Sequence, residues 1–204
     1  ACLPALAHAL LPQALQHLAT QLPDAAVGLT PLDSPQLEAA LSEQRFDLGL
    51  SERLDAPAAC SLEHLLVADE VAVLPAGHRL CGRPRLSAAD FEGGAFISLA
   101  PGDPYRQQVD DWFAQAGVSR VLRLETASAV SVCALVEQGL GVGVVNPLTA
   151  LAMQGPRLLV RPLAVSIPFR VSLMRPAWRA EPPLRSPLEA ALRQTAQALQ
   201  QELA

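Results

Sequence analysis

The sequence contains no lysine, so all 15 of its cationic residues are arginine, against 20 acidic residues. The formal net charge is −5. Domains that bind nucleic acids normally carry a basic face that engages phosphates. Here the arginines, among them Arg45, Arg83 and Arg123, are scattered between acids. This charge pattern argues against direct DNA binding by these residues.

The sequence also has few features of membrane, secreted or metal-binding proteins. No apolar run approaches the roughly 20 residues of a membrane span, and the first residues lack the pattern of a signal peptide. The four cysteines, Cys2, Cys60, Cys81 and Cys133, form no CxxC pair, and no histidine lies at metal-ligand spacing. We therefore expect free thiols, no metal or other cofactor, no membrane association and a cytoplasmic location.

Signatures of catalysis are missing as well. The sequence contains no HExxH, GxSxG, GxGxxG or GxxxxGK pattern, which are common signs of hydrolases and of nucleotide binding. Cys133 lies among apolar neighbours, as an inert core thiol does. Gly141 and Gly143 are interpreted as close-packing positions in a buried strand. We expect that the chain is not an enzyme.

Half of the 204 residues are hydrophobic but only 4% are aromatic, which allows one large domain or two small lobes. Apolar residues at helical spacing predict a helix over 5–21, followed by strands over 26–30 and 46–50. Between these strands, Ser34 is predicted to be the N-cap of a helix, with Pro35 in its first turn. This alternation of strands and helices indicates an α/β unit with a parallel sheet.

The remaining chain predicts a second unit of the same kind over about 84–160, after which the chain returns to the first. The predicted elements are an extended segment over 65–74, a short helix over 86–91, strands over 95–99, 121–125, 141–145, 158–163 and 169–174, and helices over 105–115, 128–138 and from Ser186 onward. We predict lobe I from 1–74 and 161–204 and lobe II from 75–160. This is the order of elements in hinged two-lobed binding proteins, which bind a ligand between the lobes.

Several segments carry a resemblance to a known family. They are residues 125–136 continuing into 139–147, with a GxGV strand, and the shorter motifs at 10–12, 47–50 and 75–80. In this order and spacing they resemble the effector-sensing domains of LysR-type transcription regulators, over nearly the whole chain. The resemblance implies an α/β, two-lobed, type 2 periplasmic-binding-protein-like fold with a ligand cleft between the lobes. It also implies a homodimer or homotetramer that contacts DNA only through an N-terminal helix-turn-helix absent from this sequence.

One branch of the family is especially similar. Residues 97–99, 103, 105–107, 146–151 and 168–173 resemble the lysine-biosynthesis activators that respond to diaminopimelate. The implied effector is an amino acid, diaminopimelate or lysine. The alternative is a solute-binding protein for amino-acid uptake.

An amino-acid ligand needs N–H groups and hydroxyls near a helix N-terminus for its carboxylate, and carboxylates or carbonyls for its ammonium. Candidates follow the predicted strands in both lobes. They are Pro4, Ala5, Leu6, Asp33 and Ser34 in lobe I, and Ser98, Asp103, Tyr105, Arg106, Thr126, Ser128, Asn146 and Pro147 in lobe II.

Each polar candidate also has an ordinary structural interpretation. Ser34, Asp103, Thr126 and Ser128 are residue types that begin helices, and Arg106 could be a solvated helix arginine. The sequence leaves both interpretations open. For dimerisation, residues 36–45 and the helix after Ser128 are the predicted contributors.

Overall fold

A computed structural model describes residues 1–203 and divides the chain into two compact units. The first unit holds Ala1–Ala68 and the chain from Arg170 onward, and the second holds Asp69–Phe169. The strand over Val71–Pro75 pairs with strands of the second unit, and Glu70 N–H donates to Ile167 O at 2.9 Å. The predicted boundaries at 75 and 160 therefore lie inside the second unit, because this pairing draws both flanking segments into its sheet.

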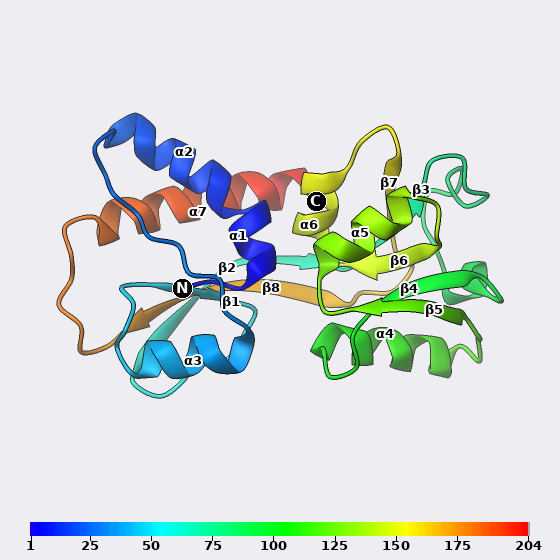
Figure 1. The fold of residues 1–204 in the computed structure, drawn as a ribbon, viewed down its shortest axis with the longest axis horizontal. Coiled ribbons are helices and arrows are strands. Elements are labelled where there is room, and N and C mark those ends of the chain that lie inside the picture. Colours follow the sequence, from blue (N-terminus) through cyan, green and yellow to red (C-terminus); the bar gives the residue numbers. More distant parts are fainter. Residues whose placement is uncertain (204) are drawn as a thin grey trace. The chain divides into compact units, whose positions relative to one another are not determined.

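The first unit is built on a three-stranded sheet with strand order β1-β8-β2. Its strands are β1 (Gly49–Ser51), β2 (Cys60–Asp69) and β8 (Pro168–Pro176), and its helices are α1 (Pro4–Ala9), α2 (Leu11–Gln21), α3 (Ser34–Ser42) and α7 (Arg185–Glu202). Strand β1 is antiparallel to β8, with Gly49 opposite Met174. In Figure 1, α2 and α7 lie side by side on one face and α3 lies on the other.

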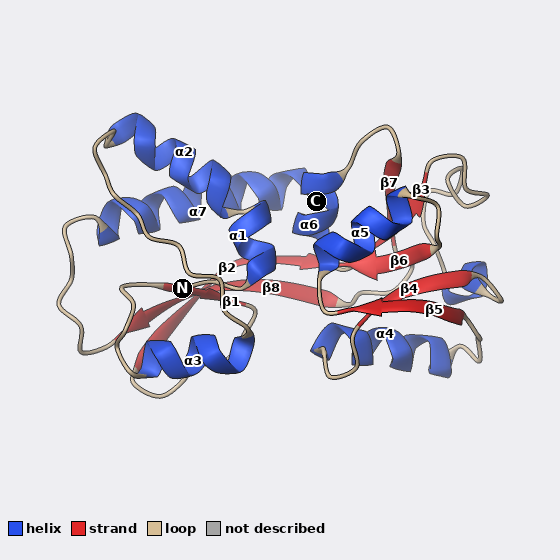
Figure 2. Cartoon of the chain, in the orientation of Figure 1, coloured by secondary structure: helices blue, strands red, loops and turns tan. Residues whose placement is uncertain are grey.

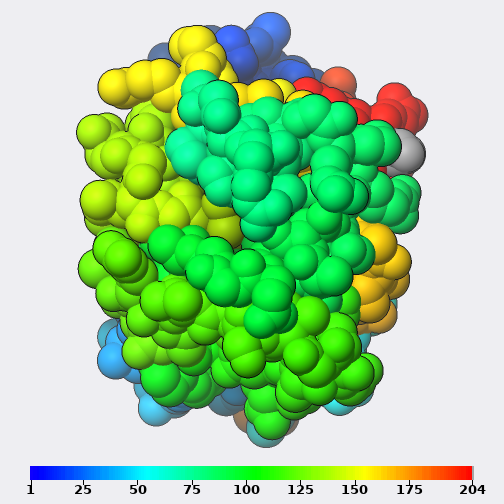
Figure 3. Space-filling model, turned by 90° about the vertical axis from the view of Figure 1, so that its right-hand side faces the viewer, coloured from blue at the N-terminus to red at the C-terminus, as the bar shows by residue number. Residues whose placement is uncertain are grey.

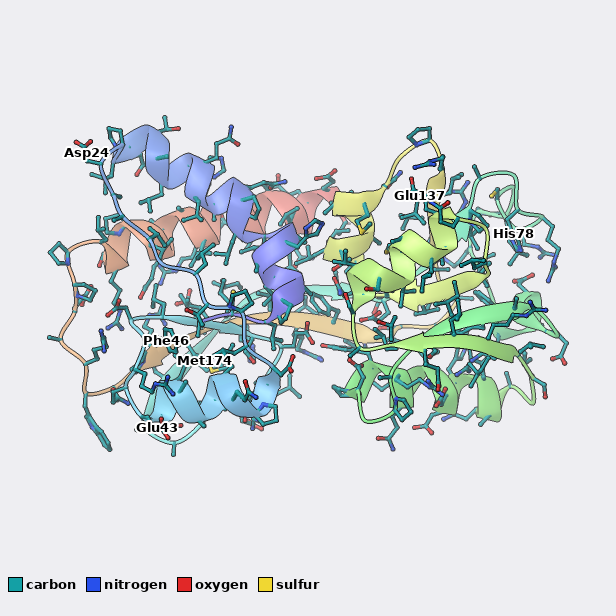
Figure 4. All side chains as sticks on the ribbon, viewed as in Figure 1. Asp24, Glu43, Phe46, His78, Glu137 and Met174 are labelled. Atoms are coloured by element: carbon teal, nitrogen blue, oxygen red, sulfur yellow. The ribbon has the colours of Figure 1, made fainter. Side chains whose placement is uncertain are left out.

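The core beneath α3 is small and aliphatic. Leu37 and Leu41 of α3 and Met174 of β8 are fully buried, and Ala1 and Phe46 are among the residues that pack against them. Figure 4 shows Phe46 and Met174 close together beside α3. Burying such side chains stabilises the fold by roughly 1.5–3 kcal/mol each.

Three expectations for the first unit are wrong in detail. The helix predicted over 5–21 is broken at Leu10 into α1 and α2, because Pro12 has no N–H to donate to the carbonyl of His8. The predicted strand over 26–30 is absent among the described residues. Only Pro31 forms a bridge there, in parallel with Cys2, and the strand expected over 46–50 shrinks to β1.

The second unit is a five-stranded mixed sheet with strand order β5-β4-β6-β3-β7. Its strands are β3 (Val71–Pro75), β4 (Ala95–Leu99), β5 (Val121–Thr126), β6 (Val142–Val145) and β7 (Leu158–Pro162). Strand β4 is parallel to β5 and β6, whereas β3 is antiparallel to β6 and β7. The extended segment predicted over 65–74 is thus two strands, β2 and β3, in different sheets.

Helices cover both faces of this second sheet. They are the 3-10 helix η1 (Ala88–Phe91) and the α-helices α4 (Pro104–Gln115), α5 (Ala129–Glu137) and α6 (Pro147–Met153). Figure 2 shows α4 on one face and α5 on the other. No helix was predicted at the position of α6, because Asn146 and Pro147 were considered only as ligand candidates that follow a strand. An asparagine before a proline is also a favourable helix start, since the asparagine caps and the proline fits the first turn.

Aromatic rings form the core under α4. Phe91, Phe96 and Phe113 meet edge to face, with ring centroids 5.5–6.0 Å apart, a favourable geometry for aromatic pairs. The guanidinium of Arg120 lies 4.3 Å from the centre of the Phe113 ring. On the opposite face, a Cβ added to Gly143 would approach Val132 Cγ1 to 2.7 Å. The close-packing interpretation of this glycine is confirmed.

The connection from β3 to η1 forms part of the outer surface of the second unit (Figure 3). Arg161 of β7 holds this connection by donating to Cys81 O at 2.6 Å and to Arg83 O at 3.1 Å. Cys81 is half-buried. The connection is therefore anchored through backbone carbonyls.

Candidate functional site

Three helix starts meet at one edge of the second sheet. Strands β5, β4 and β6 are neighbours and parallel, so their carboxyl ends lie at the same edge, and each strand is followed by a helix. We call residues 98–106, 125–128 and 146–149 the carboxyl edge. All eight candidates predicted in this unit belong to it, and ligands of α/β proteins commonly bind at such edges.

Each helix at the carboxyl edge has a capping side chain. Asp103 Oδ1 accepts from Tyr105 N–H at 2.8 Å and from Arg106 N–H at 3.1 Å. Ser128 Oγ accepts from Ser131 N–H at 3.2 Å, and Asn146 Oδ1 accepts from the N–H of Thr149 at 2.8 Å. The capping interpretations of Asp103 and Ser128 are therefore confirmed.

Two hydroxyls at this edge keep their protons available. Thr126 Oγ1 accepts from Ser128 N–H at 3.3 Å, and Ser128 Oγ acts only as the cap acceptor. Within residues 1–203, neither hydroxyl donates to a protein acceptor. Both are partly exposed, and they precede the positive end of the α5 dipole. This pair can donate to a carboxylate.

The guanidinium of Arg106 is buried and forms hydrogen bonds within the protein. Its Nη1 donates to Leu99 O at 2.7 Å and to Glu125 Oε1 at 2.6 Å, and its Nε donates to Asp110 Oδ2 at 2.7 Å. Burial opposes the charge, but the bonds to Glu125 and Asp110 outweigh it and raise the pKa of Arg106. Arg106 therefore fixes the end of β4 and the carboxylate of Glu125.

Tyr105 and Ser98 are nearly fully buried, with exposed fractions of 8% and 2%. The ring of Tyr105 packs against Phe169 with centroids 5.6 Å apart. Both residues line a narrow space beside the buried Glu70, and this space is too small to hold a water molecule. The structure thus gives Tyr105 a packing role.

The candidates of the first unit lie at two neighbouring helix starts. Cys2 bridges Pro31 and Leu50 in parallel, so the starts of α1 and α3 follow adjacent extended segments. Pro4 and Ala5 are at least partly exposed there. Leu6 is fully buried, and its N–H donates to Leu3 O at 3.0 Å.

Ser34 was predicted to be the N-cap of its helix, and this is wrong. Asp33 occupies the cap position without a side-chain hydrogen bond. Ser34 lies inside the first turn, where its hydroxyl donates to Glu38 Oε1 at 2.8 Å. The preceding bridge at Pro31 sets the end of the extended segment, and the helix begins at Ser34, one residue earlier than the capping pattern indicated.

Two residues of the carboxyl edge are not among the ligand candidates predicted from the sequence. Glu125 is the residue before the last one of β5, and its side chain is 42% exposed. The Oγ1 atom of Thr149, in contrast, is buried without a hydrogen-bond partner in the described chain. The position of Glu125 directly before Thr126, at the carboxyl end of the predicted strand, could have indicated it as a ligand candidate. No signal marked Thr149, because the helix that carries it was not predicted.

Residues elsewhere in the described chain offer no reactive centre. Burial raises the pKa of the Cys133 thiol to about 12. His64 lies 3.0 Å from Ser172 Oγ, but Ser172 is buried and its hydroxyl donates to Arg53 O at 2.8 Å. Within residues 1–203, no cluster of three potential metal ligands exists, and no helix is long and apolar enough to cross a membrane.

Comparison with known proteins agrees with this fold. Residues 1–202 match the family described as LysR substrate binding domain. The chain is 47% identical over 179 residues to the transcriptional activator protein LysR of Escherichia coli K12, covering 88% of this chain and 58% of that protein. It is 31% identical over 202 residues to the regulatory protein NocR of Agrobacterium tumefaciens T37, covering 99% and 67%.

A solved structure shares the architecture. The regulatory domain of CcmR from Synechocystis PCC6803, in complex with 2-PG, superposes with a TM-score of 0.77 at 18% identity, covering 96% of this chain and 94% of that one. The two α/β units therefore have the type 2 periplasmic-binding-protein-like fold of regulatory domains, as predicted. The class is that of effector-binding domains of transcription regulators, which are not enzymes.

The chain belongs to the LysR substrate-binding-domain family. It spans 58% of the length of the Escherichia coli activator that it matches.

Proposed function

We propose that this domain binds an amino-acid effector, diaminopimelate or lysine, and thereby modulates transcription by a longer LysR-type regulator. The 47% identity to the Escherichia coli activator supports this branch of the family. The alternative of a solute-binding protein for uptake finds no support in the relatives described above. As a transcription regulator, the protein would act in the cytoplasm and reach DNA through a separate helix-turn-helix.

The observation that carries the proposal is the pair of hydroxyl donors at the start of α5. An effector carboxylate placed there would accept from Thr126 and Ser128 and gain from the helix dipole. Glu125, one strand residue earlier, is the carboxylate for an effector ammonium, and Arg106 holds it in place at 2.6 Å. Ser98, Asp103, Tyr105, Asn146 and Pro147 shape the same edge. Pro4, Ala5, Leu6, Asp33 and Ser34 remain proposed contacts of the first unit.

Isothermal titration calorimetry tests the effector class. We expect saturable heat with diaminopimelate or lysine and none with benzoate. Saturation by benzoate with no heat from any amino acid would contradict the proposal.

Thr126→Ala separates ligand binding from fold stability. Thr126 does not cap α5, so the ligand-free Tm should stay within about 2 °C. Losing a hydroxyl that donates to a charged ligand costs about 1.5–3 kcal/mol, or roughly ten- to hundredfold in Kd. Ser128→Ala removes the cap together with the second proposed donor, so it should lower the Tm by roughly 2–4 °C in addition to weakening binding. An unchanged Kd for Thr126→Ala would remove Thr126 from the site.

We also propose that the domain forms homodimers, or homotetramers in a longer protein. Residues 36–45 and helix α5 are the proposed contributors. Light scattering at high micromolar concentration should then report about twice the chain mass of 21.6 kDa. A single species at the monomer mass would argue against self-association of this domain.

A further inference from the structure

Four charged side chains of alternating sign connect the core under α4 to the carboxyl edge. Arg120 binds one carboxylate oxygen of Asp110, and Arg106 Nε donates to the other at 2.7 Å. Arg106 Nη1 in turn donates to Glu125 Oε1 at 2.6 Å. We call these four residues the charge row. The charges of its two arginines and its two carboxylates balance each other.

The inner end of the charge row is fixed by the aromatic core. The guanidinium of Arg120 lies 4.3 Å from the centre of the Phe113 ring and 4.8 Å from that of Phe96, where a cation is attracted to the ring faces. Its side chain is 7% exposed. Because a buried cation needs a counter-charge, Arg120 holds the carboxylate of Asp110 in place.

At the outer end, Arg106 is shared between two carboxylates. Its Nε faces Asp110 and its Nη1 faces Glu125, while its own side chain is only 10% exposed. Glu125 belongs to the carboxyl edge, whereas Asp110 lies one turn further along α4 and outside this edge. The share of the Arg106 charge that Glu125 has to neutralise therefore depends on Asp110.

We propose that Asp110 is a positioning residue that sets the charge specificity of the carboxyl edge. It binds both arginines of the charge row and thereby leaves the negative charge of Glu125 available to a ligand ammonium. The inference rests on the proposed function, in which Glu125 binds the ammonium of the effector. Without the Asp110 carboxylate, two buried guanidinium groups would face Glu125 alone. The local charge would become more positive by one unit, which disfavours an ammonium and favours a carboxylate at this edge.

Asp110→Asn tests this role, because asparagine keeps the shape of the side chain and removes its charge. The two ligands are diaminopimelate and pimelate, which has the same two carboxylates and no ammonium. If lysine binds better than diaminopimelate, lysine and hexanoate form the equivalent pair. Calorimetry should show that the Kd of diaminopimelate rises roughly tenfold in Asp110→Asn, while the Kd of pimelate falls.

Three further variants separate charge from structure. The matched control Asp111→Asn changes the net charge by the same amount at a neighbouring exposed position, and should change both Kd values by no more than about twofold. Asp110→Glu keeps the charge and should retain the preference for diaminopimelate. Combining Asp110→Asn with Arg120→Gln restores the charge balance of the row and should recover this preference. Circular dichroism checks that each variant is folded.

The ratio of the two Kd values is the deciding quantity, because a merely structural loss weakens both ligands alike. An unchanged ratio in folded Asp110→Asn, an equal loss of affinity for both ligands, or the same change of ratio in Asp111→Asn would each overturn the role of Asp110 and leave the proposed function standing. Absence of binding of both diaminopimelate and lysine to the wild-type chain would overturn the proposed function, and this inference with it.

Discussion

Glu63→Gln should destabilise the first unit in a pH-dependent way. Glu63 lies on β2 and contacts two arginines from different elements. Arg193 of α7 donates to it at 2.7 and 2.9 Å, and Arg175 of β8 forms a further ion pair with it. Glu189 of α7 binds the same two arginines. This network joins α7 to the sheet.

The size of the effect follows from the pKa of Glu63. Hydrogen bonds from Arg193 and Arg175 lower this pKa from 4.5 to about 2. At about 1.4 kcal/mol per pKa unit, the full shift corresponds to roughly 3 kcal/mol. The side chain is 34% exposed, and solvent screening reduces such contributions. We therefore expect Glu63→Gln to cost about 1–2 kcal/mol at pH 7.

The sign of the pH dependence is set by the lowered pKa. The carboxylate contributes fully above its unfolded pKa near 4.5, and the contribution disappears as the pH falls toward 2. The stability difference between wild type and Glu63→Gln should therefore shrink between pH 5 and pH 2.5.

Urea unfolding followed by circular dichroism measures this difference. The matched control is Glu43→Gln, whose ion pair with Arg45 spans 3.7 Å between two side chains that are 65% and 63% exposed. It should stay within about 0.5 kcal/mol of wild type. A Glu63→Gln difference that is the same at pH 7 and pH 3 would refute the electrostatic reasoning and point to packing instead.

Two further outcomes test the second unit. Gly141→Ala should lower the free energy of unfolding in urea by about 1–3 kcal/mol, because the new Cβ would lie 2.8 Å from a backbone oxygen of β4. The control Gly82→Ala, at a position with open space around it, should stay within about 0.5 kcal/mol of wild type. Equal effects of the two substitutions would show that Gly141 is not a packing position. Iodoacetamide at pH 8 should modify the half-buried Cys81 before Cys133, whose pKa of about 12 leaves it protonated. Peptide mapping by mass spectrometry reads the order, and faster labelling of Cys133 in the folded protein would contradict its burial.

Local sequence patterns were sufficient for most helices and strands of the second unit. The strand over 95–99 and the short helix after Ser87 form as predicted, because a short apolar run and a helix cap depend on neighbouring residues. The same patterns placed Thr126, Ser128 and Asp103 at strand-to-helix junctions. The resemblance to the LysR family, carried by residues 125–147, was also readable in the sequence.

Tertiary contacts decided what local patterns could not. Strand β3 joins the second sheet because β6 and β7 offer it partners, and no property of residues 71–75 alone selects that sheet. The strand expected over 26–30 needs a neighbour along its whole length, and the described chain supplies one only beside Thr30 and Pro31.

The role of Arg106 was likewise set by residues distant in sequence. Its guanidinium binds Glu125, 19 positions away, which only the parallel pairing of β4 with β5 brings within reach. Local sequence could mark Arg106 as a cation at a helix start. Whether it meets solvent, a ligand or a neighbouring carboxylate depends on which strand lies beside it, because an ion pair forms only where long-range strand pairing places its two charges in contact.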